Sequence, residues 1–318
     1  MFTDIAESEL RDYAGSQVDP DDFDEFWADT LSESRALPLD VVVEPVASPL
    51  STVDVFDVTF FGYRGQPVKA WLRLPAAAEA PLPALVQFVG YGGGRGHALE
   101  NLLWASAGFA HFQMDTRGQG SSWSSGDTPD PEGSAPAFPG FMTRGIESRE
   151  TYYYRRVIVD AVRAVEAARS LPAIDASRVS VLGFSQGGGL ALAVAGLIPD
   201  LRAAFPFVPF LCDFPRATTI TDNDPYHEIV RYLAIHRGKT AAALETLQYF
   251  DGVNFAKRAS SPGYFSTALM DPTCPPSTVF AAYNSYAAAK EITVWPYNAH
   301  EGGALQDELK ALEVLLER

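Results

Sequence analysis

Basic residues and long apolar segments are scarce in this chain of 318 residues. Lys and Arg number 24 against 40 Asp and Glu, which gives a formal net charge of −16. An acidic surface is repelled by the phosphates of nucleic acids and by anionic membranes, so neither is expected as a partner. The longest apolar stretch, 188–198, is shorter than the roughly 20 residues that a membrane-spanning helix needs.

Cysteine is scarcer still, because only Cys212 and Cys274 are present, and this excludes a disulfide-stapled fold. We expect two reduced thiols, with a single bridge as the alternative. The first residues, MFTDIAESELRDY, lack the basic and apolar segments of a secretory signal. Together these features predict a cytoplasmic protein. His and Cys show no metal-ligand spacing, so neither a metal nor an organic cofactor is expected.

The chain does contain a regular alternation of predicted strands and helices. Short, mainly apolar runs bounded by turns are typical of strands buried on both faces of a parallel sheet. Helical stretches between such runs predict an α/β fold, with a mostly parallel central sheet, helices on both faces and ligands at the carboxyl ends of the strands. The predicted strands are 84–90, 109–114, 179–183, 203–208 and 264–270, and the predicted helices are 152–171, 186–197 and 276–289.

Two further segments, one before and one after the alternating region, add to this core. Residues 53–61 and 67–74 alternate in polarity and predict an antiparallel hairpin. Residues 303–318 have the pattern of an amphipathic terminal helix. No internal repeat or low-complexity linker divides the chain, so residues 1–318 are expected to form a single domain.

Residues 1–35 predict an N-terminal helical extension. Phe23, Phe26 and Trp27 recur there at helical spacing within an acidic segment. We expect this aromatic stripe to pack on the main body; a ligand or partner site is the alternative.

A G-x-S-x-G motif at 183–187 centres on Ser185, after a predicted strand and at the start of a predicted helix. Such a context is typical of a nucleophile elbow, in which the flanking glycines permit a strained turn that exposes the serine hydroxyl. The helix N-terminus behind the serine also favours a developing anion. The alternative is a glycine-rich turn required only for close helix packing.

A serine nucleophile needs a histidine base, and the chain has five histidines. In this architecture the chain order is serine, acid, histidine, which excludes His97 and His111. His300 lies in a polar loop, YNAHEGG, between a predicted strand and the last helix. It is favoured over His227 and His236, which fall in a predicted surface helix.

The acid must fall between the serine and the histidine and lie at a strand end. Asp271 closes an apolar run and is followed by Pro272, which stops regular structure. Its task would be to orient the imidazole and stabilise the imidazolium. Asp213 and Asp251 are weaker candidates because neither ends a convincing strand, and a simple turn role for Asp271 is the alternative.

An oxyanion hole needs two preorganised backbone N–H groups. One is expected from Gln186, directly after the serine, and the other from the glycine-rich segment 91–96 that begins at Tyr91. A phosphate-binding loop is not favoured, because the segment lacks both G-x-G-x-x-G spacing and a Gly-Lys-Ser/Thr ending.

Three motifs together resemble those of carbohydrate esterase family seven, the acetyl xylan esterases and cephalosporin C deacetylases. They are RGQ at Arg117, Gly118 and Gln119, GFSQG at 183–187, and the pair His300-Glu301. The similarity continues through DEFW near 23–27, PGFMTRGI at 139–146, TYYYRRV at 151–157, YFDGVNFA at 249–256 and CPPSTVFAAYN at 274–284. It therefore covers nearly the whole chain.

This resemblance implies an α/β-hydrolase fold, a Ser185–His300–Asp271 triad, and an oxyanion hole from the amides of Tyr91 and Gln186. The RGQ residues would brace the loops around the elbow. Family members form homohexamers, arranged as a dimer of trimers, and remove acetyl groups from short xylo-oligosaccharides and cephalosporin C; some also use hydrogen peroxide as acyl acceptor.

Tyr91, Phe210 and Thr273 would be substrate-binding residues, although Phe210 is equally compatible with the core. A short-chain carboxylesterase or a serine peptidase of the same fold is the alternative function, and a catalytically silent binding protein is a weaker one.

Overall fold

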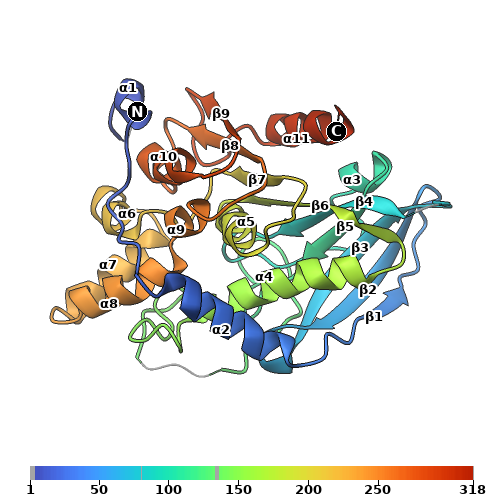
Figure 1. The fold of residues 1–318 in the computed structure, drawn as a ribbon, viewed down its shortest axis with the longest axis horizontal. Helices are drawn as coiled ribbons and strands as arrows, with labels where there is room; N and C mark the ends of the chain where they lie inside the picture. The colour runs from blue at the N-terminus through green and yellow to red at the C-terminus, as the bar shows by residue number, and fades with distance from the viewer. Residues whose placement is uncertain (1–3, 80, 133–135, 318) are drawn as a thin grey trace.

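The computed structural model describes residues 4–79, 81–132 and 136–317, and in that part of the chain nine strands form one twisted sheet (Figure 1). The strand order is β1-β2-β3-β5-β4-β6-β7-β8-β9. Strands β1, β2, β3 and β5 pair antiparallel, and all neighbours from β5 to β9 pair parallel. The strands are β1 (Val42–Pro45), β2 (Val53–Phe61), β3 (Pro67–Pro75), β4 (Leu82–Phe88), β5 (Ala110–Met114), β6 (Ile174–Phe184), β7 (Ala204–Phe207), β8 (Gly263–Ala268) and β9 (Lys290–Trp295).

Helices cover both faces of the sheet, as the α/β pattern predicts. None of them, over the described ranges, is long and apolar enough to cross a lipid bilayer. The α-helices are α1 (Glu7–Leu10), α2 (Phe23–Arg35), α3 (Leu103–Ser106), α4 (Tyr153–Ser170), α5 (Gln186–Leu197), α6 (Phe214–Ile220), α7 (Tyr226–Ile235), α8 (Thr240–Leu247), α9 (Gly252–Ala256), α10 (Pro276–Ser285) and α11 (Leu305–Glu317), and two short 3₁₀ turns are Tyr63–Gly65 and Gln248–Phe250.

Alternating side chains on the central strands divide the core into two layers. Leu85 and Leu182 point to the layer under α3 and α11, whereas Val86 and Val181 point to the larger layer under α4 and α5. In Figure 1, α11 and α4 lie on opposite sides of the sheet. The strands are therefore buried on both faces, which explains their nearly continuous apolar sequences.

The predicted mostly parallel sheet is confirmed, with differences at its edges. Strand β1 was not predicted because it spans four residues, VVEP, which do not alternate between apolar and polar and are all exposed. Strand β6 begins at Ile174, earlier than predicted. The prediction missed this start because the residues just after Ile174 are largely exposed and form no apolar run. Strand β8 ends at Ala268, which leaves Asp271 in the following loop. The terminal helix begins at Leu305, and Arg318 of the predicted range lies outside the described residues.

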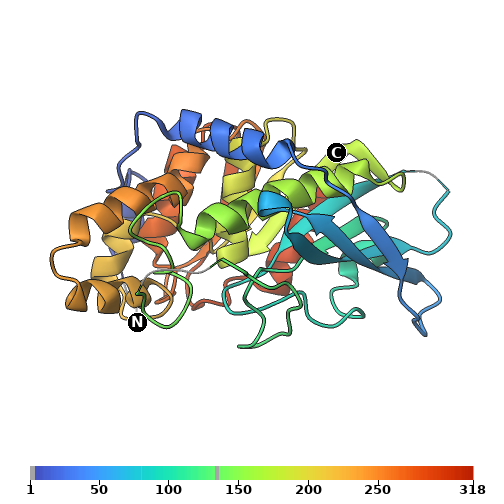
Figure 2. The same ribbon diagram turned by 90° about the horizontal axis from the view of Figure 1, so that it is seen from below.

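The aromatic residues of α2 are buried against the body of the protein. Trp27 donates its indole N–H to the Tyr249 carbonyl at 2.9 Å. Phe23 packs edge-on against Phe255, with ring centroids 5.1 Å apart. Helix α2 lies alongside α4 in both ribbon views (Figures 1 and 2). The stripe is thus accounted for by packing.

The connection from β7 to β8 carries four helices, α6 to α9. In Figure 1 helices α6 to α8 form a group at the left of the view. The sequence predicted a helix around His227 and His236, which is α7, but not the rest of this group. These helices matter for the site because the turn before α7 and α7 itself approach Ser185 and Tyr91.

A buried ion pair joins the RGQ segment to α4. Arg117 donates from Nε to Oδ2 of Asp160 at 2.5 Å and from a terminal nitrogen to Oδ1 at 2.8 Å. The two side chains are 0% and 1% exposed. Asp160 also accepts the backbone N–H of Tyr63 at 2.8 Å. The pair therefore ties the loop after β5 to α4 and to the hairpin turn.

Arg117→Met is expected to destabilise the fold by about 3–5 kcal/mol, because it leaves the Asp160 carboxylate buried without its cation. Urea unfolding measures the loss. Arg178→Met is the matched control, since its pair with Asp175 is exposed and contributes less than about 1 kcal/mol. Equal losses in the two variants would contradict a special role for the buried pair.

Candidate active site

Ser185 lies at the turn between β6 and α5 in a conformation that few non-glycine residues adopt, with φ 58° and ψ −118°. Its N–H donates to the Phe207 carbonyl at 3.0 Å. The two glycines of the motif allow the backbone of this turn to pack closely against its neighbours. A Cβ at Gly183 would lie 2.1 Å from the backbone of Gly187, and a Cβ at Gly187 would lie 2.2 Å from the Phe88 carbonyl oxygen. Neither position can carry a side chain without moving backbone.

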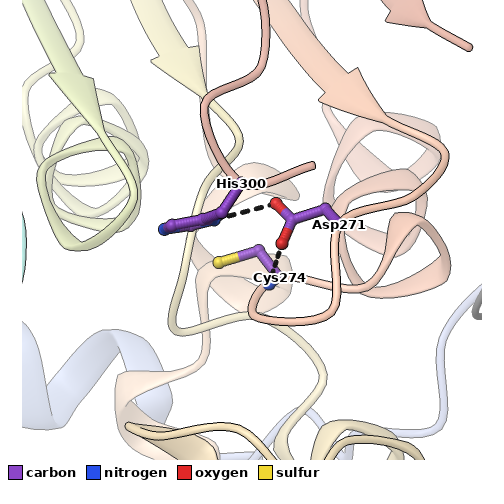
Figure 3. A group of neighbouring side chains, drawn as sticks. All are labelled: Asp271, Cys274 and His300. Carbon is purple, nitrogen blue, oxygen red and sulfur yellow. Dashed lines mark hydrogen bonds and ion pairs between the residues drawn. The ribbon is translucent and has the colours of Figure 1, made fainter. Parts of the chain in front are cut away.

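A continuous hydrogen-bonded chain begins at this serine. His300 Nε2 lies 3.0 Å from Ser185 Oγ, and His300 Nδ1 lies 2.8 Å from Asp271 Oδ2. Figure 3 shows the imidazole facing the Asp271 carboxylate. Asp271 is fully buried, whereas the His300 side chain is 30% exposed. The structure thus brings the three residues together from the loops after β6, β8 and β9, all at the carboxyl ends of parallel strands.

Backbone amides orient the aspartate. The Asp271 oxygen that faces away from the imidazole accepts the N–H groups of Thr273 at 2.8 Å and Cys274 at 2.9 Å. These bonds leave Oδ2 directed at His300 Nδ1. The arrangement suits a carboxylate that holds one tautomer of the imidazole and stabilises its charged form.

The histidine loop is held at its far end by Asp307. This carboxylate accepts the indole N–H of Trp295 and the backbone N–H of Gly303, both at 2.9 Å. Phe184, the residue before the serine, packs against the imidazole with centroids 5.4 Å apart. His300 is therefore confined in position while its side chain stays partly exposed.

The weaker candidates have other contacts. Asp213 accepts the Tyr13 hydroxyl at 2.7 Å, and Asp251 accepts the Asp213 amide at 3.0 Å, so both serve the packing of the N-terminal segment and α9. Burial raises the pKa of Asp251 to about 7. The His236 ring packs at a tilt against Tyr232 of α7, with ring centroids 4.3 Å apart. The carboxylate that meets His300 is Asp271.

The proposed oxyanion amides lie on two loops near Ser185. Gln186 is the first residue of α5, and Tyr91 follows β4. Among the described residues, neither the Tyr91 nor the Gln186 amide donates a hydrogen bond within the protein. Around Tyr91 the backbone is fixed, because its carbonyl accepts the Trp123 indole N–H at 2.8 Å and the next amide, Gly92, donates to Gln119 at 2.7 Å.

The Gln119 side chain connects these two loops. Its oxygen accepts from Gly92, and its nitrogen donates to the Gln186 side chain at 2.9 Å and to the Tyr153 hydroxyl at 3.0 Å. Gly118 before it has φ +70°, a conformation that favours glycine. Arg117, Gly118 and Gln119 lie behind the site, and the Gln119 side chain contacts both segments that are predicted to supply oxyanion amides.

A pocket of about 550 Å³ opens in front of Ser185. Thr273 and Tyr91 line it, as the resemblance implies. Phe210 does not; it is fully buried and packs edge-on against Tyr91, with centroids 6.3 Å apart, which favours the core interpretation. The lining residues are Gly90, Tyr91, Trp123, Phe184, Ser185, Asp224, Pro225, Thr273 and His300.

Trp123, Asp224 and Pro225 were missed by sequence reasoning. They enter from the loop after the RGQ segment and from the turn before α7. The only available signal was that Trp123 follows Gln119 closely in sequence.

One group of side chains has the spacing of a possible metal site. The donor atoms of Asp271, Cys274 and His300 lie within 4.8 Å of one another (Figure 3). His300 Nδ1 and Asp271 Oδ2 are already hydrogen-bonded to each other at 2.8 Å. Burial raises the pKa of the Cys274 thiol well above its usual range, which keeps it protonated and a poor ligand. The group therefore fits a hydrogen-bonded triad better than a metal centre. Cys274 and Cys212 are both free and buried.

The fold and the serine, histidine and aspartate at its strand ends define an α/β-hydrolase. A model of the acetyl xylan esterase family matches residues 1–316. The chain therefore belongs to that family of carboxylic ester hydrolases, as its motifs indicate.

Solved structures of two similar proteins match the fold of this chain over nearly its whole length. An acetyl xylan esterase from Paenibacillus sp. R4 is 39% identical, with a TM-score of 0.92 over 98% of this chain and 99% of that one. Acetyl xylan esterase 1 from Thermoanaerobacterium sp. JW/SL YS485 is 33% identical, with a TM-score of 0.92 over 99% of both chains.

A curated relative, acetyl esterase Axe7A of Xylanibacter ruminicola, is 30% identical in an alignment 295 residues long that covers 88% of this chain. This chain spans 63% of the length of that relative.

Gln119→Leu is expected to lower kcat for p-nitrophenyl acetate about tenfold to a hundredfold with KM nearly unchanged. The variant leaves the Gly92 amide without its acceptor, so the neighbouring oxyanion segment loses its fixed orientation; direct loss of one oxyanion donor costs about 10²–10³ in kcat. Gln306→Leu, an exposed change on α11, is the control. A folded Gln119→Leu enzyme with normal kcat, or with only a raised KM, would refute this role.

Proposed function

We propose that the chain is a serine esterase that removes O-acetyl groups from short acetylated xylo-oligosaccharides and from cephalosporin C. The observation that carries the proposal is the hydrogen-bonded chain from Ser185 through His300 to Asp271 at a pocket, in a member of the acetyl xylan esterase family. The two solved relatives are named as acetyl xylan esterases and the curated relative as an acetyl esterase, which supports an acetyl ester as substrate.

Acyl transfer would begin with attack of Ser185 Oγ on the acetyl carbonyl carbon. His300 Nε2, 3.0 Å from Oγ, takes the hydroxyl proton as the new C–O bond forms. Asp271 stabilises the resulting imidazolium through Nδ1. The amides of Tyr91 and Gln186 bind the oxygen on which negative charge develops.

Collapse of this intermediate breaks the bond to the sugar oxygen. His300 returns its proton to that oxygen, which leaves as an alcohol, and the acetyl group stays on Ser185. Water then enters and repeats the sequence with His300 as base, which releases acetate. Every step uses groups of this chain and water, and the proposed chemistry calls for no cofactor.

Ser185→Ala is expected to abolish acetate release from acetylated xylo-oligosaccharides, cephalosporin C and p-nitrophenyl acetate, with kcat lower by at least about 10⁴-fold. Wild type should hydrolyse the acetate ester faster than the butyrate. Ser180→Ala, on the same strand, is the matched control and should keep full activity.

Three results would change the proposal. Full activity in Ser185→Ala would reject the nucleophile. Butyrate turnover equal to acetate turnover, with no release from sugars or cephalosporin C, would indicate a general short-chain carboxylesterase. Cleavage of peptide amides without sugar deacetylation would indicate a peptidase, and binding without any turnover a silent relative.

We also propose a cytoplasmic homohexamer, on the family resemblance. Sedimentation equilibrium is expected to yield a mass six times that of one chain over a range of concentrations. A monomer or dimer mass would contradict this assembly. Fractionation of the source cells tests the location separately.

A further inference from the structure

Glu228 on α7 is a buried carboxylate that the triad does not use. Glu228 is 5% exposed, and no Lys, Arg or His of the described ranges forms an ion pair with its carboxylate. Burial raises the pKa of its carboxyl group. Burying such a group is costly unless its oxygens are hydrogen-bonded, so its partners indicate its purpose.

The first partner is the hydroxyl of Tyr91, which donates to Glu228 Oε1 at 2.6 Å. The other carboxylate oxygen accepts the backbone N–H of Met142 at 3.1 Å. The Tyr91 oxygen in turn accepts the N–H of Phe141 at 2.7 Å. Gly140 completes the enclosure, since a Cβ there would lie 2.1 Å from the Glu228 carboxylate. The loop at 140–142 thus closes tightly around one tyrosine–glutamate contact.

Tyr91 is therefore held at both ends. Its phenol is fixed by Glu228 and Phe141, and its backbone carbonyl is fixed by the Trp123 indole at 2.8 Å. The ring between these anchors packs against Phe141 and Phe210, with centroids 5.7 Å and 6.3 Å away. A residue fixed at its carbonyl, ring and hydroxyl has little freedom to rotate its own N–H.

That N–H is one of the two amides proposed to bind the oxyanion. Such donors work because they are already oriented before charge develops, and they lose effect when they must reorganise during the reaction. A side-chain anchor is needed at this position because Tyr91 lies in a glycine-rich segment, 91–96, whose backbone is intrinsically permissive.

We propose that Glu228 is a positioning residue of the oxyanion hole: its carboxylate accepts the Tyr91 hydroxyl and so holds the Tyr91 amide in the orientation that stabilises the charged acyl intermediate. The inference rests on the proposed esterase function. It assigns to the α6–α9 helices a part in catalysis, because one of them supplies the acceptor.

Two variants delete or weaken this contact with little change in volume. Tyr91→Phe deletes the hydroxyl. Glu228→Gln keeps the shape but supplies one oxygen acceptor in place of two, so it cannot accept from both Tyr91 and the Met142 amide. Tyr232→Phe is the matched control, since this tyrosine lies on the same helix and donates to Glu147 at 3.1 Å, away from the pocket.

The experiment measures kcat and KM for p-nitrophenyl acetate, and inhibition by 1,1,1-trifluoroacetone. The ketone accepts Ser185 Oγ at its carbonyl carbon, the serine proton passes to His300, and the former carbonyl oxygen becomes an oxyanion in the same hole. Both contact variants are expected to lower kcat about tenfold to a hundredfold, to leave KM within about threefold, and to weaken ketone inhibition by a factor similar to the loss in kcat.

The double variant should lose little more activity than either single variant, because both changes act on one contact. Tyr232→Phe should match wild type in kcat, KM and ketone inhibition.

A purely structural role for Glu228 predicts another outcome. Thermal unfolding would then show lower stability, while kcat and ketone inhibition of the folded enzyme stayed at wild-type values, and this would overturn the inference. Where Glu228→Gln does not fold, Tyr91→Phe alone decides between the two outcomes.

Failure of the proposed function would look different. Ester hydrolysis that persists in Ser185→Ala rejects the esterase site itself. Hydrolysis that depends on Ser185 but is unchanged by Tyr91→Phe and Glu228→Gln rejects only the positioning role.

Discussion

Close contact between the start of α5 and the ends of β4 and β6 is the constraint on which the rest of this site depends. Ser185 is held in a sparsely populated backbone conformation because Gly183 and Gly187 let the turn, the helix and the Phe88 carbonyl approach within a distance that excludes a Cβ. Strain of this kind persists only where the surrounding structure overdetermines it. The buried strands on either side, packed on both faces, supply that rigidity.

Around this turn, neighbouring backbone amides and side chains hold the residues of the candidate site in place. Asp271 is aimed by backbone amides, His300 by its loop and by Phe184, and the segment after Tyr91 by Gln119. Behind these, the fully buried Arg117–Asp160 pair joins the RGQ loop to α4. The active-site groups therefore sit on a rigid frame, which is what catalysis by preoriented donors requires.

Sequence reasoning succeeded where a signal is local. The hairpin at 53–75, the central strands and helices α4, α5 and α11 follow from apolar periodicity, and the family follows from three short motifs. It failed where local signals are weak. The four-residue strand β1 shows no alternation of apolar and polar residues, and most of the helices between β7 and β8 were not foreseen. The sequence left Phe210 open between pocket and core, and its burial and packing against Tyr91 favour the core.

The sequence by itself determined the strand–turn–helix around Ser185, the chain order of the candidate serine, acid and histidine, and the glycine-rich segment predicted to supply an oxyanion amide, because steric and catalytic demands restrict which residues can occupy those positions. Only the tertiary structure decided which carboxylate meets His300, which side chains line the pocket, and that Glu228 of α7 contacts Tyr91. Those contacts join segments far apart in the chain. Their geometry depends on how helices and loops pack around the sheet, which no short stretch of residues encodes.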